Sequence, residues 1–314
     1  MILADVLLVL ARCAPVFAVV GVFSIAASAD TPGSSTGSHS QKTVRDLMWV
    51  WGNPGMAEEG AHTAATFAAA GPAERAKILG VPNVIMAGRG LPRDDTEARQ
   101  LMAGVAHMPR VIWEIEGDPE DGGPPFVYTE TIARLGRLAD DYAQIEGLLL
   151  DDMTSVGIDK GFGPEHIRDV RKLVAGTCPQ VKVYGVVYTM NFDRETVDAC
   201  VEELDAISLW TWHARDIPDL ERNVAHCERQ FPGTPILLGL YLYDYGEDRR
   251  MPLDLLEKQC ETALELLHAG RIEGIVFLTI KNDPEAVSWT ADWIGKVGGQ
   301  PVGKPDQSDG SSGE

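Results

Sequence analysis

The sequence contains few cysteines, and none of them has the spacing of a metal-binding or redox motif. Cys13 lies in an apolar N-terminal segment, and the remaining four are Cys178, Cys200, Cys227 and Cys260. The absence of a C-x-x-C pair excludes zinc ribbons and thioredoxin-type redox motifs. Three of the four fall in stretches with helical spacing, so we expect buried thiols rather than a disulfide framework.

Histidine and several short catalytic motifs are also scarce. Of the seven histidines, His213 alone clearly ends an apolar run, which argues against a zinc site. There is no G-x-S-x-G motif of a serine nucleophile. Gly88-Arg89-Gly90 lacks the third glycine and the later acidic residue of a dinucleotide-binding turn. We therefore expect an enzyme that uses no cofactor.

Positive charge is limited: 27 Lys and Arg stand against 47 Asp and Glu, and the formal net charge is -20. Long-range repulsion excludes nucleic acid and anionic membrane surfaces as partners. The charge suits a neutral or cationic ligand, and it equally suits an acidic surface that keeps an exported protein soluble. The oligomeric state is not predicted.

Long apolar runs are absent beyond the first 29 residues. A single cation, Arg12, precedes the apolar stretch 13–27, and Ala27-Ser28-Ala29 fits a cleavage site, so 1–29 is predicted to be a signal peptide. An uncleaved anchor is the alternative. We expect an exported bacterial protein, periplasmic or extracellular, that is free of the membrane after cleavage.

In the rest of the chain, short apolar runs alternate regularly with segments of helical spacing. Residues 30–44 are predicted to form a flexible linker, 45–296 one domain, and 297–314 a disordered tail. Within the domain, helical segments alternate with eight apolar runs, at 46–51, 83–88, 110–116, 147–152, 182–189, 205–212, 235–244 and 274–280. Continuous apolar strands alternating with helices indicate a parallel sheet buried on both faces. Eight such units predict a single (β/α)8 (TIM) barrel; an open doubly wound sheet is the alternative. Asp193 and Asp216 are expected as helix N-caps.

Acidic and aromatic residues gather where the predicted strands end. In such a barrel these ends and the following loops form the active-site face. The candidate catalytic residues are Asp152, Asp151, Glu116, Glu114 and Asp244. The candidate substrate-binding residues are Trp51, Asn53, Arg89, Tyr188, Trp210, Trp212, His213, Tyr241 and Tyr243. Aromatic faces stack on sugar rings while carboxylates and amides bond their hydroxyls, so a carbohydrate is the expected partner. Some of these aromatics are also expected to fill the barrel core.

The sharpest motif is the apolar run from Gly147 that ends in Asp151 and Asp152. Charge at the end of a buried strand is costly unless it is paired or functional. Strand alternation predicts that one carboxylate points into the barrel mouth and the other towards a neighbouring strand end or helix N-terminus. A helix cap or an ion pair is the alternative role for either one alone.

The G-x-x-x-D-D run resembles the fourth strand of several (β/α)8 glycoside hydrolases, as in the chitinase-like group, and of many uncharacterised barrels from environmental bacteria. Met153 and Thr154 stand where the chitinase-like D-x-x-D-x-D-x-E pattern would place its terminal glutamate. The resemblance therefore implies the barrel and an acid-ended fourth strand, but not a substrate-assisted mechanism.

The resulting hypothesis is an exported glycoside hydrolase-like enzyme that uses a pair of carboxyl groups. Asp152 is expected to be the acid/base and Asp151 to orient it, with Glu116 or Asp244 as the second carboxylate. One alternative is a non-catalytic carbohydrate-binding barrel. A second is a lyase or hydrolase in which carboxylates such as Glu116 and Asp152 bind Mg²⁺ or Ca²⁺.

Overall fold

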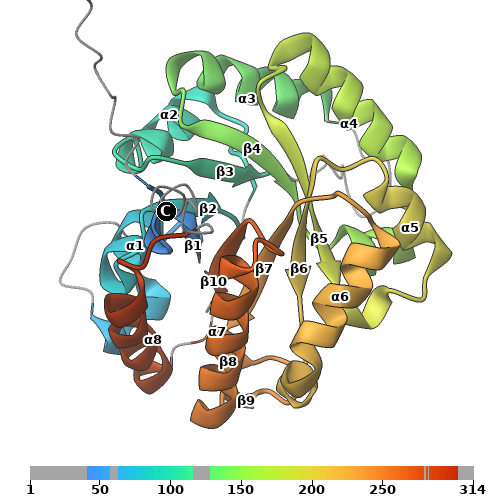
Figure 1. The fold of residues 1–314 in the computed structure, drawn as a ribbon. Coiled ribbons are helices and arrows are strands. Elements are labelled where there is room, and N and C mark those ends of the chain that lie inside the picture. The colour runs from blue at the N-terminus through green and yellow to red at the C-terminus, as the bar shows by residue number, and fades with distance from the viewer. Residues whose placement is uncertain are drawn as a thin grey trace, which may run out of the picture. The chain divides into compact units, whose positions relative to one another are not determined.

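The computed structural model describes residues 41–56, 63–88, 90–115, 128–278, 281 and 283–302, and the eight predicted apolar runs form a closed barrel. Every pair of neighbouring barrel strands is parallel. The chain order is also the order around the barrel, which closes between the first and last strands (Figure 1). The predicted (β/α)8 fold is confirmed.

The barrel strands are slightly shorter than the apolar runs that predicted them. They are β1 (Met48–Gly52), β2 (Asn83–Met86), β3 (Val111–Glu114), β4 (Ile145–Leu150), β5 (Lys182–Tyr188), β6 (Ala206–Trp210), β7 (Ile236–Tyr241) and β10 (Gly274–Leu278). The residues that follow each strand, such as Asp151 after β4 and Trp212 after β6, begin the loops at the C-terminal edge of the barrel, which we call the mouth. The acidic and aromatic residues singled out above lie at this C-terminal edge because each apolar run ends there.

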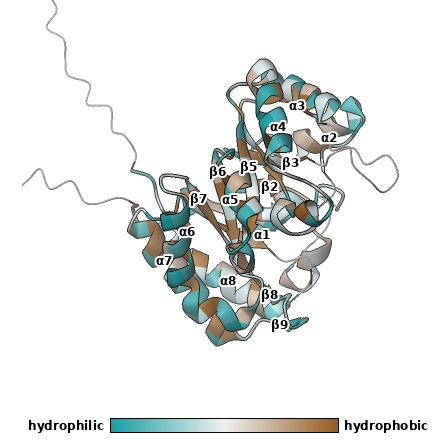
Figure 2. Ribbon diagram, turned by 90° about the vertical axis from the view of Figure 1, so that its right-hand side faces the viewer, coloured by the Kyte–Doolittle hydropathy of each residue, from teal (hydrophilic) through white to brown (hydrophobic). Residues whose placement is uncertain are grey.

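Eight α-helices surround the barrel in the described part of the chain. They are α1 (Pro72–Leu79), α2 (Asp95–Gly104), α3 (Thr129–Asp141), α4 (Pro164–Thr177), α5 (Glu195–Val201), α6 (Leu220–Gln230), α7 (Leu253–His268) and α8 (Pro284–Val297). Their apolar faces turn towards the strands and their polar faces turn outwards (Figure 2). The expected N-caps at Asp193 and Asp216 are wrong, since α5 has Arg194 at its N-cap and Asp216 lies inside a short 3-10 helix, Ala214–Asp219.

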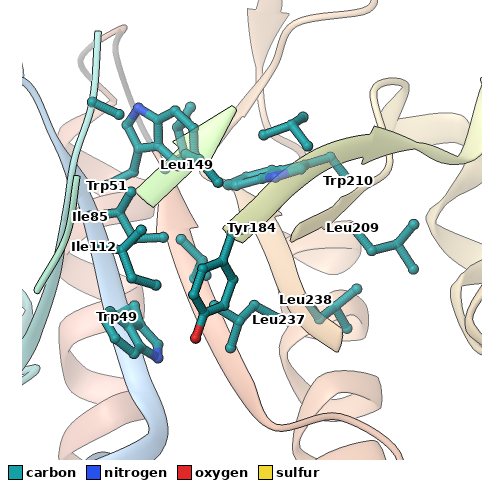
Figure 3. Packing of buried hydrophobic residues seen from close by; sticks show 14 of the residues in the cluster. Trp49, Trp51, Ile85, Ile112, Leu149, Tyr184, Leu209, Trp210, Leu237 and Leu238 are labelled. Atoms are coloured by element: carbon teal, nitrogen blue, oxygen red, sulfur yellow. The ribbon is translucent and has the colours of Figure 1, made fainter. Parts of the chain in front are cut away.

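The barrel interior is filled by side chains and differs between its two ends. Trp51 and Trp210 approach each other towards one end, while Trp49 and the hydroxyl of Tyr184 lie at the other (Figure 3). At the N-terminal end of the strands, Arg110 forms two hydrogen bonds to Glu146, of 2.5 and 2.8 Å, and lies over the Trp49 ring. Tyr184 donates to the same carboxylate at 3.0 Å. Side-chain packing and charge pairing thus occupy the N-terminal end of the barrel, and the strand-end residues singled out above lie at the other end.

The four cysteines of the described chain are buried and free, as predicted (Cys178, Cys200, Cys227, Cys260). The segments on either side of the predicted domain, 45–296, contact each other. Thr43 pairs with Pro301, and the Val302 N–H donates to the carbonyl of Lys42. The expected signal peptide 1–29, most of the linker and the tail beyond Val302 lie outside the described residues. Within the described ranges, no helix combines the length and apolar character that crossing a bilayer requires.

One element was not expected from the sequence. A short antiparallel hairpin, β8 (Tyr243–Asp244) with β9 (Arg249–Arg250), follows β7 at the barrel mouth. The apolar run 235–244 had suggested one long strand. The barrel strand ends at Tyr241 instead, and Tyr243 and Asp244 leave the barrel to pair with the two arginines. The hairpin therefore adds aromatic and charged groups to the mouth.

Candidate active site

The carboxylate pair, Asp151 and Asp152, follows β4 at the mouth. Leu149 lies in the barrel interior, so strand alternation directs Asp151 towards the mouth, where it is half-buried. Its Oδ1 accepts the backbone N–H of Asp152 at 2.8 Å. The exposed Asp152 side chain turns to the end of the neighbouring strand β5, where the Tyr188 hydroxyl donates to Asp152 Oδ1 at 2.8 Å. Asp151 thus holds the backbone of Asp152, and Tyr188 holds its side chain.

The backbone at Asp152 is strained. Its φ of 48° is in the left-handed region, which costs energy for a residue with a Cβ. A single π-helical turn, Met153–Gly157, follows at once, and the N–H of Gly157 donates to the Asp152 carbonyl at 2.9 Å. Left-handed non-glycine residues and isolated π turns both concentrate at functional sites. The strand end is therefore built to present Asp152 in one orientation.

Loop residues after β5 fix this turn from outside. Asn191 donates to the carbonyl of Thr154 at 2.9 Å, and Arg194 donates to the same carbonyl at 3.3 Å. The Thr154 hydroxyl in turn donates to the carbonyl of Val186 at 3.1 Å. Arg194 was not predicted, because nothing in the sequence indicates that it reaches back to the preceding loop. It acts as a support for the turn that carries Asp152.

Two buried tyrosines stand beside the carboxylate pair. Burial, together with the nearby Tyr241, Asp151 and Asp152, raises the pKa of the Tyr188 phenol well above its usual range. Burial and the charge of Asp151 raise the pKa of Tyr241 in the same direction. Both phenols therefore stay protonated at neutral pH, and Tyr188 remains a hydrogen-bond donor to Asp152.

Five aromatic side chains form what we call the aromatic wall, on the side of the mouth contributed by β5, β6, β7 and the hairpin. They are Tyr188, Trp212, Tyr241, Tyr243 and Tyr245. Trp212, Tyr243 and Tyr245 are half-buried, whereas Tyr188 and Tyr241 are buried. Neighbouring rings lie with centroids 5.0–6.0 Å apart. The wall connects the hairpin continuously to the tyrosine that holds Asp152.

Beneath the wall, Trp51 and Trp210 form the floor of the mouth. Their rings meet edge to face at 5.5 Å, and the Trp210 ring lies 4.9 Å from that of Tyr241. The indole N–H of Trp210 donates to the Ser208 hydroxyl at 2.8 Å. Trp210 is 1% and Trp51 is 5% exposed, so these two predicted substrate-binding residues support the site from below and leave little surface to contact a ligand.

Polar side chains lie at the ends of β1 and β3, on the opposite side of the mouth. The buried Glu114 accepts the backbone N–H groups of Gly88 and, at 3.4 Å, Gly90. The Asn53 side chain lies against Gly88, and its Oδ1 accepts the N–H of Gly55 at 2.8 Å. Gly88 has a φ of 106°, which only glycine adopts readily. Glu114 therefore fixes the loop after β2.

Asp244 has a comparable role in the hairpin. Its buried carboxylate accepts the backbone N–H groups of Ala214 at 3.2 Å and Glu247 at 3.3 Å, and pairs with Arg249 at 3.0 Å. These bonds fasten the hairpin to the loop after β6. Both carboxylate oxygens of Asp244 therefore have partners that hold the hairpin in position.

The remaining predicted residues lie around the hairpin or outside the described chain. His213 lies against Gly246, with Nδ1 3.9 Å from Glu247. Tyr243 donates to Asp248 at 3.1 Å, and Lys281 lies over its ring. Glu116 and Arg89 are outside the described residues. Across the described residues, no three or more His, Cys, Asp or Glu side chains are arranged to hold a metal ion.

Comparison with known proteins identifies similar folds but no family to which the chain belongs. No family model matches the chain, and no curated protein matches its sequence. Among solved structures, the chain is similar to the spore cortex-lytic enzyme SleL of Bacillus cereus, with 11% identity over 85% of this chain and 76% of that one, at a TM-score of 0.54. The SleL enzyme of Bacillus megaterium gives 9% identity, the same coverage and a TM-score of 0.52.

A third similar structure is a β-glucuronidase of Bacteroides uniformis, with 13% identity over 74% of this chain and a TM-score of 0.51. The match spans only 30% of that enzyme. At such identities the likeness shows the fold alone. The structural neighbours are glycoside hydrolases built on an eight-stranded parallel barrel, and this chain has the same architecture.

Proposed function

We propose that this protein hydrolyses a glycosidic bond in a carbohydrate, with Asp151 and Asp152 at the reacting centre. The observation that carries the proposal is the carboxylate pair at the end of β4, held in a strained turn next to a partly exposed aromatic wall. Sugar recognition needs an apolar ring face and polar groups side by side, and the mouth of this barrel supplies both.

Asp152 is the candidate for the group that contacts the scissile bond. The hydroxyls of Tyr188 and Ser155 both reach Oδ1, at 2.8 and 3.4 Å, which leaves Oδ2 available to a substrate. Asp151 acts as a positioning residue through its bond to the Asp152 backbone. Tyr188 orients the same carboxylate and stays protonated while it does so.

The reaction needs two carboxyl groups. One protonates the oxygen of the leaving sugar as the bond from that oxygen to the anomeric carbon breaks. The other, as a carboxylate, assists the addition of water to that carbon and takes up a proton from it. Glu114 and Asp244 are engaged in fixing loops, so the proposal assigns one of the two roles to Asp152, and Glu116 is the sequence-based candidate for the second carboxyl group.

The test is hydrolysis of a panel of polysaccharides and aryl glycosides by the full chain, compared with Asp152→Asn and Asp151→Asn. Removing a general acid or base lowers turnover by about 10²–10⁴-fold. Asp292→Asn, an exposed carboxylate on the outer helix α8, is the matched control and should retain full activity. A folded Asp152→Asn enzyme with full activity would remove Asp152 from the mechanism. If no substrate is cleaved but sugars still bind, the protein is a carbohydrate-binding barrel instead.

We also propose that residues 1–29 direct export and are then removed, which leaves Asp30 as the first residue. The proposal rests on the apolar segment 13–27 and the Ala27-Ser28-Ala29 sequence. Expression of the full chain in a bacterial host, followed by mass determination of the protein outside the cytoplasm, tests it. An unprocessed protein that stays in the membrane fraction would indicate an uncleaved anchor.

A further inference from the structure

We infer that the aromatic wall is a run of consecutive sugar-binding subsites, and that the substrate is a flat chain of neutral or amino sugars instead of a single sugar or an anionic chain. This inference rests on the proposed function and extends it to the class of substrate. It is carried by the order of the rings, by the way the hairpin is fastened, and by the charge of the mouth.

The rings follow one another in a fixed order away from the carboxylate pair. The Tyr188 hydroxyl contacts Asp152, and the Tyr188 ring meets Trp212 at 5.8 Å. Trp212 then meets Tyr245 at 5.7 Å, with an angle of 38° between the two planes. Trp212 and Tyr245 are both half-buried, so part of each residue is accessible to solvent. Two tilted, partly exposed rings in sequence suit two consecutive sugar units better than one.

The outer end of the wall is held by charge pairs as well as by packing. Asp244 pairs with Arg249 within the hairpin, Asp248 pairs with Lys281 after β10, and Glu247 pairs with Arg215 after β6. Lys281 also donates its backbone N–H to the Tyr245 hydroxyl at 3.4 Å. The hairpin is therefore tied to the loops on both sides of it. A ring held in place before binding costs less free energy to use as a subsite.

The charge of the mouth restricts the class of chain. Asp151, Asp152 and Glu114 all lie at the strand ends of the mouth, and the whole chain carries a net charge of -20. The cations around the hairpin, Arg215, Arg249 and Lys281, are each paired with a carboxylate, so the described charges of the mouth sum to a negative value that repels a polyanion such as a chain of uronic acids. Neutral sugars meet no such barrier, and amino sugars are attracted. β-1,4-linked chains of glucose or glucosamine present flat ring faces of the kind that stack on the wall.

Binding to the Asp152→Asn protein tests the inference without requiring turnover. Glucose, cellobiose and cellotetraose test the effect of chain length. A glucosamine tetramer and a galacturonic acid tetramer test the effect of positive and negative charge. Isothermal titration calorimetry with Asp152→Asn alone is compared with the same protein carrying Tyr245→Ala or Tyr245→Phe. Tyr142→Ala is the control, because Tyr142 is also a half-buried tyrosine and follows the C-terminal end of α3, at the opposite end of the barrel.

We expect affinity to rise at least tenfold from glucose to cellotetraose, and Tyr245→Ala to weaken cellotetraose binding by about tenfold, the effect of losing one buried aromatic contact. Tyr245→Phe and Tyr142→Ala should retain the length dependence, and the galacturonic acid tetramer should bind the weakest of the three tetramers. Equal affinity for glucose and cellotetraose, no effect of Tyr245→Ala, or no binding of either the neutral or the amino tetramer would overturn the inference. Length-dependent binding without hydrolysis by the unsubstituted protein would support the subsites and refute the proposed activity.

Discussion

Substitution of Gly239 by alanine should disrupt the floor of the site, and the size of the effect follows from the packing. A Cβ at position 239 would lie 2.2–2.4 Å from three atoms of the Trp210 indole. Carbon atoms in ordinary contact are about 3.5–4.0 Å apart, so the ring would have to move by more than about 1 Å. Trp210 cannot move freely, since Trp51, Tyr241 and the bond to Ser208 hold it.

Overpacking of this kind costs about 1–3 kcal/mol. For a protein of this size each kcal/mol lowers the melting temperature by roughly 2–4 °C, so Gly239→Ala should melt several degrees below the unsubstituted protein. Gly295→Ala is the matched control, because Gly295 lies on an exposed face of α8 with open space around it. That change should stabilise the protein by about 0.5–1 kcal/mol.

A double-mutant cycle gives the decisive comparison. Trp210→Phe replaces the indole with a smaller ring that has room to shift away from the new methyl group, so Gly239→Ala should cost less in the Trp210→Phe background than alone. The free energies of unfolding are measured by urea denaturation of all four proteins. Additive effects, or a Gly239→Ala protein as stable as the unsubstituted one, would show that the close packing of Gly239 against Trp210 is not a constraint.

Three further predictions concern groups that support the fold. Burial raises the pKa of Cys200 to about 11 and that of Cys227 to about 12, from 9.0. Above pH 9 the unfolded chain therefore loses thiol protons that the folded chain keeps, so the free energy of unfolding should fall between pH 9 and 11. The fall should be less steep in Cys227→Ala. A melting temperature that is constant over this pH range would contradict the prediction. Asp244→Ala leaves buried N–H groups without an acceptor and should lower the free energy of unfolding by about 1–3 kcal/mol. It should also make the hairpin susceptible to limited proteolysis. A hairpin that the protease does not cut would show that Asp244 does not hold it in place. Tyr184→Phe removes one bond to Glu146 and should cost about 1 kcal/mol in urea unfolding, whereas an unchanged midpoint would mean that the bond contributes nothing.

Much of the fold could be predicted because a parallel barrel imposes a strong periodic pattern. Each strand is buried on both faces, so the apolar runs are continuous and stand apart from the helical segments. The ends of the elements were less predictable. The run from Pro235 to Tyr243 has no charged residue, yet the barrel strand stops at Tyr241. The reason is that Tyr243 and Asp244 pair with Arg249 and Arg250 in a hairpin that depends on contacts between distant loops.

The sequence also predicted which residues gather at the site, but it did not predict the role of each residue there. Strand ends gather at one edge of the barrel, so the sequence shows which side chains meet there. Glu114 and Asp151 look alike in the sequence, and only the structure shows that Glu114 bonds the N–H groups of the loop after β2 while Asp151 holds the backbone of Asp152. The left-handed conformation of Asp152 and its bond to Tyr188 likewise have no sequence signal, because Tyr188 lies 36 positions away along the chain.

The central claim is that the protein adds water across a glycosidic bond with Asp152 as one of the two reacting carboxyl groups, and cleavage in ¹⁸O-labelled water tests it most directly. The full chain is incubated with an oligosaccharide that it hydrolyses. The products are analysed by mass spectrometry beside those of Asp152→Asn and the control Asp292→Asn. The account predicts one ¹⁸O at the anomeric carbon of each new reducing end, with the same yield from Asp292→Asn and a loss of about 10²-fold or more in Asp152→Asn. Products without the label, as a lyase would give, or an Asp152→Asn enzyme as fast as the unsubstituted one, would contradict it.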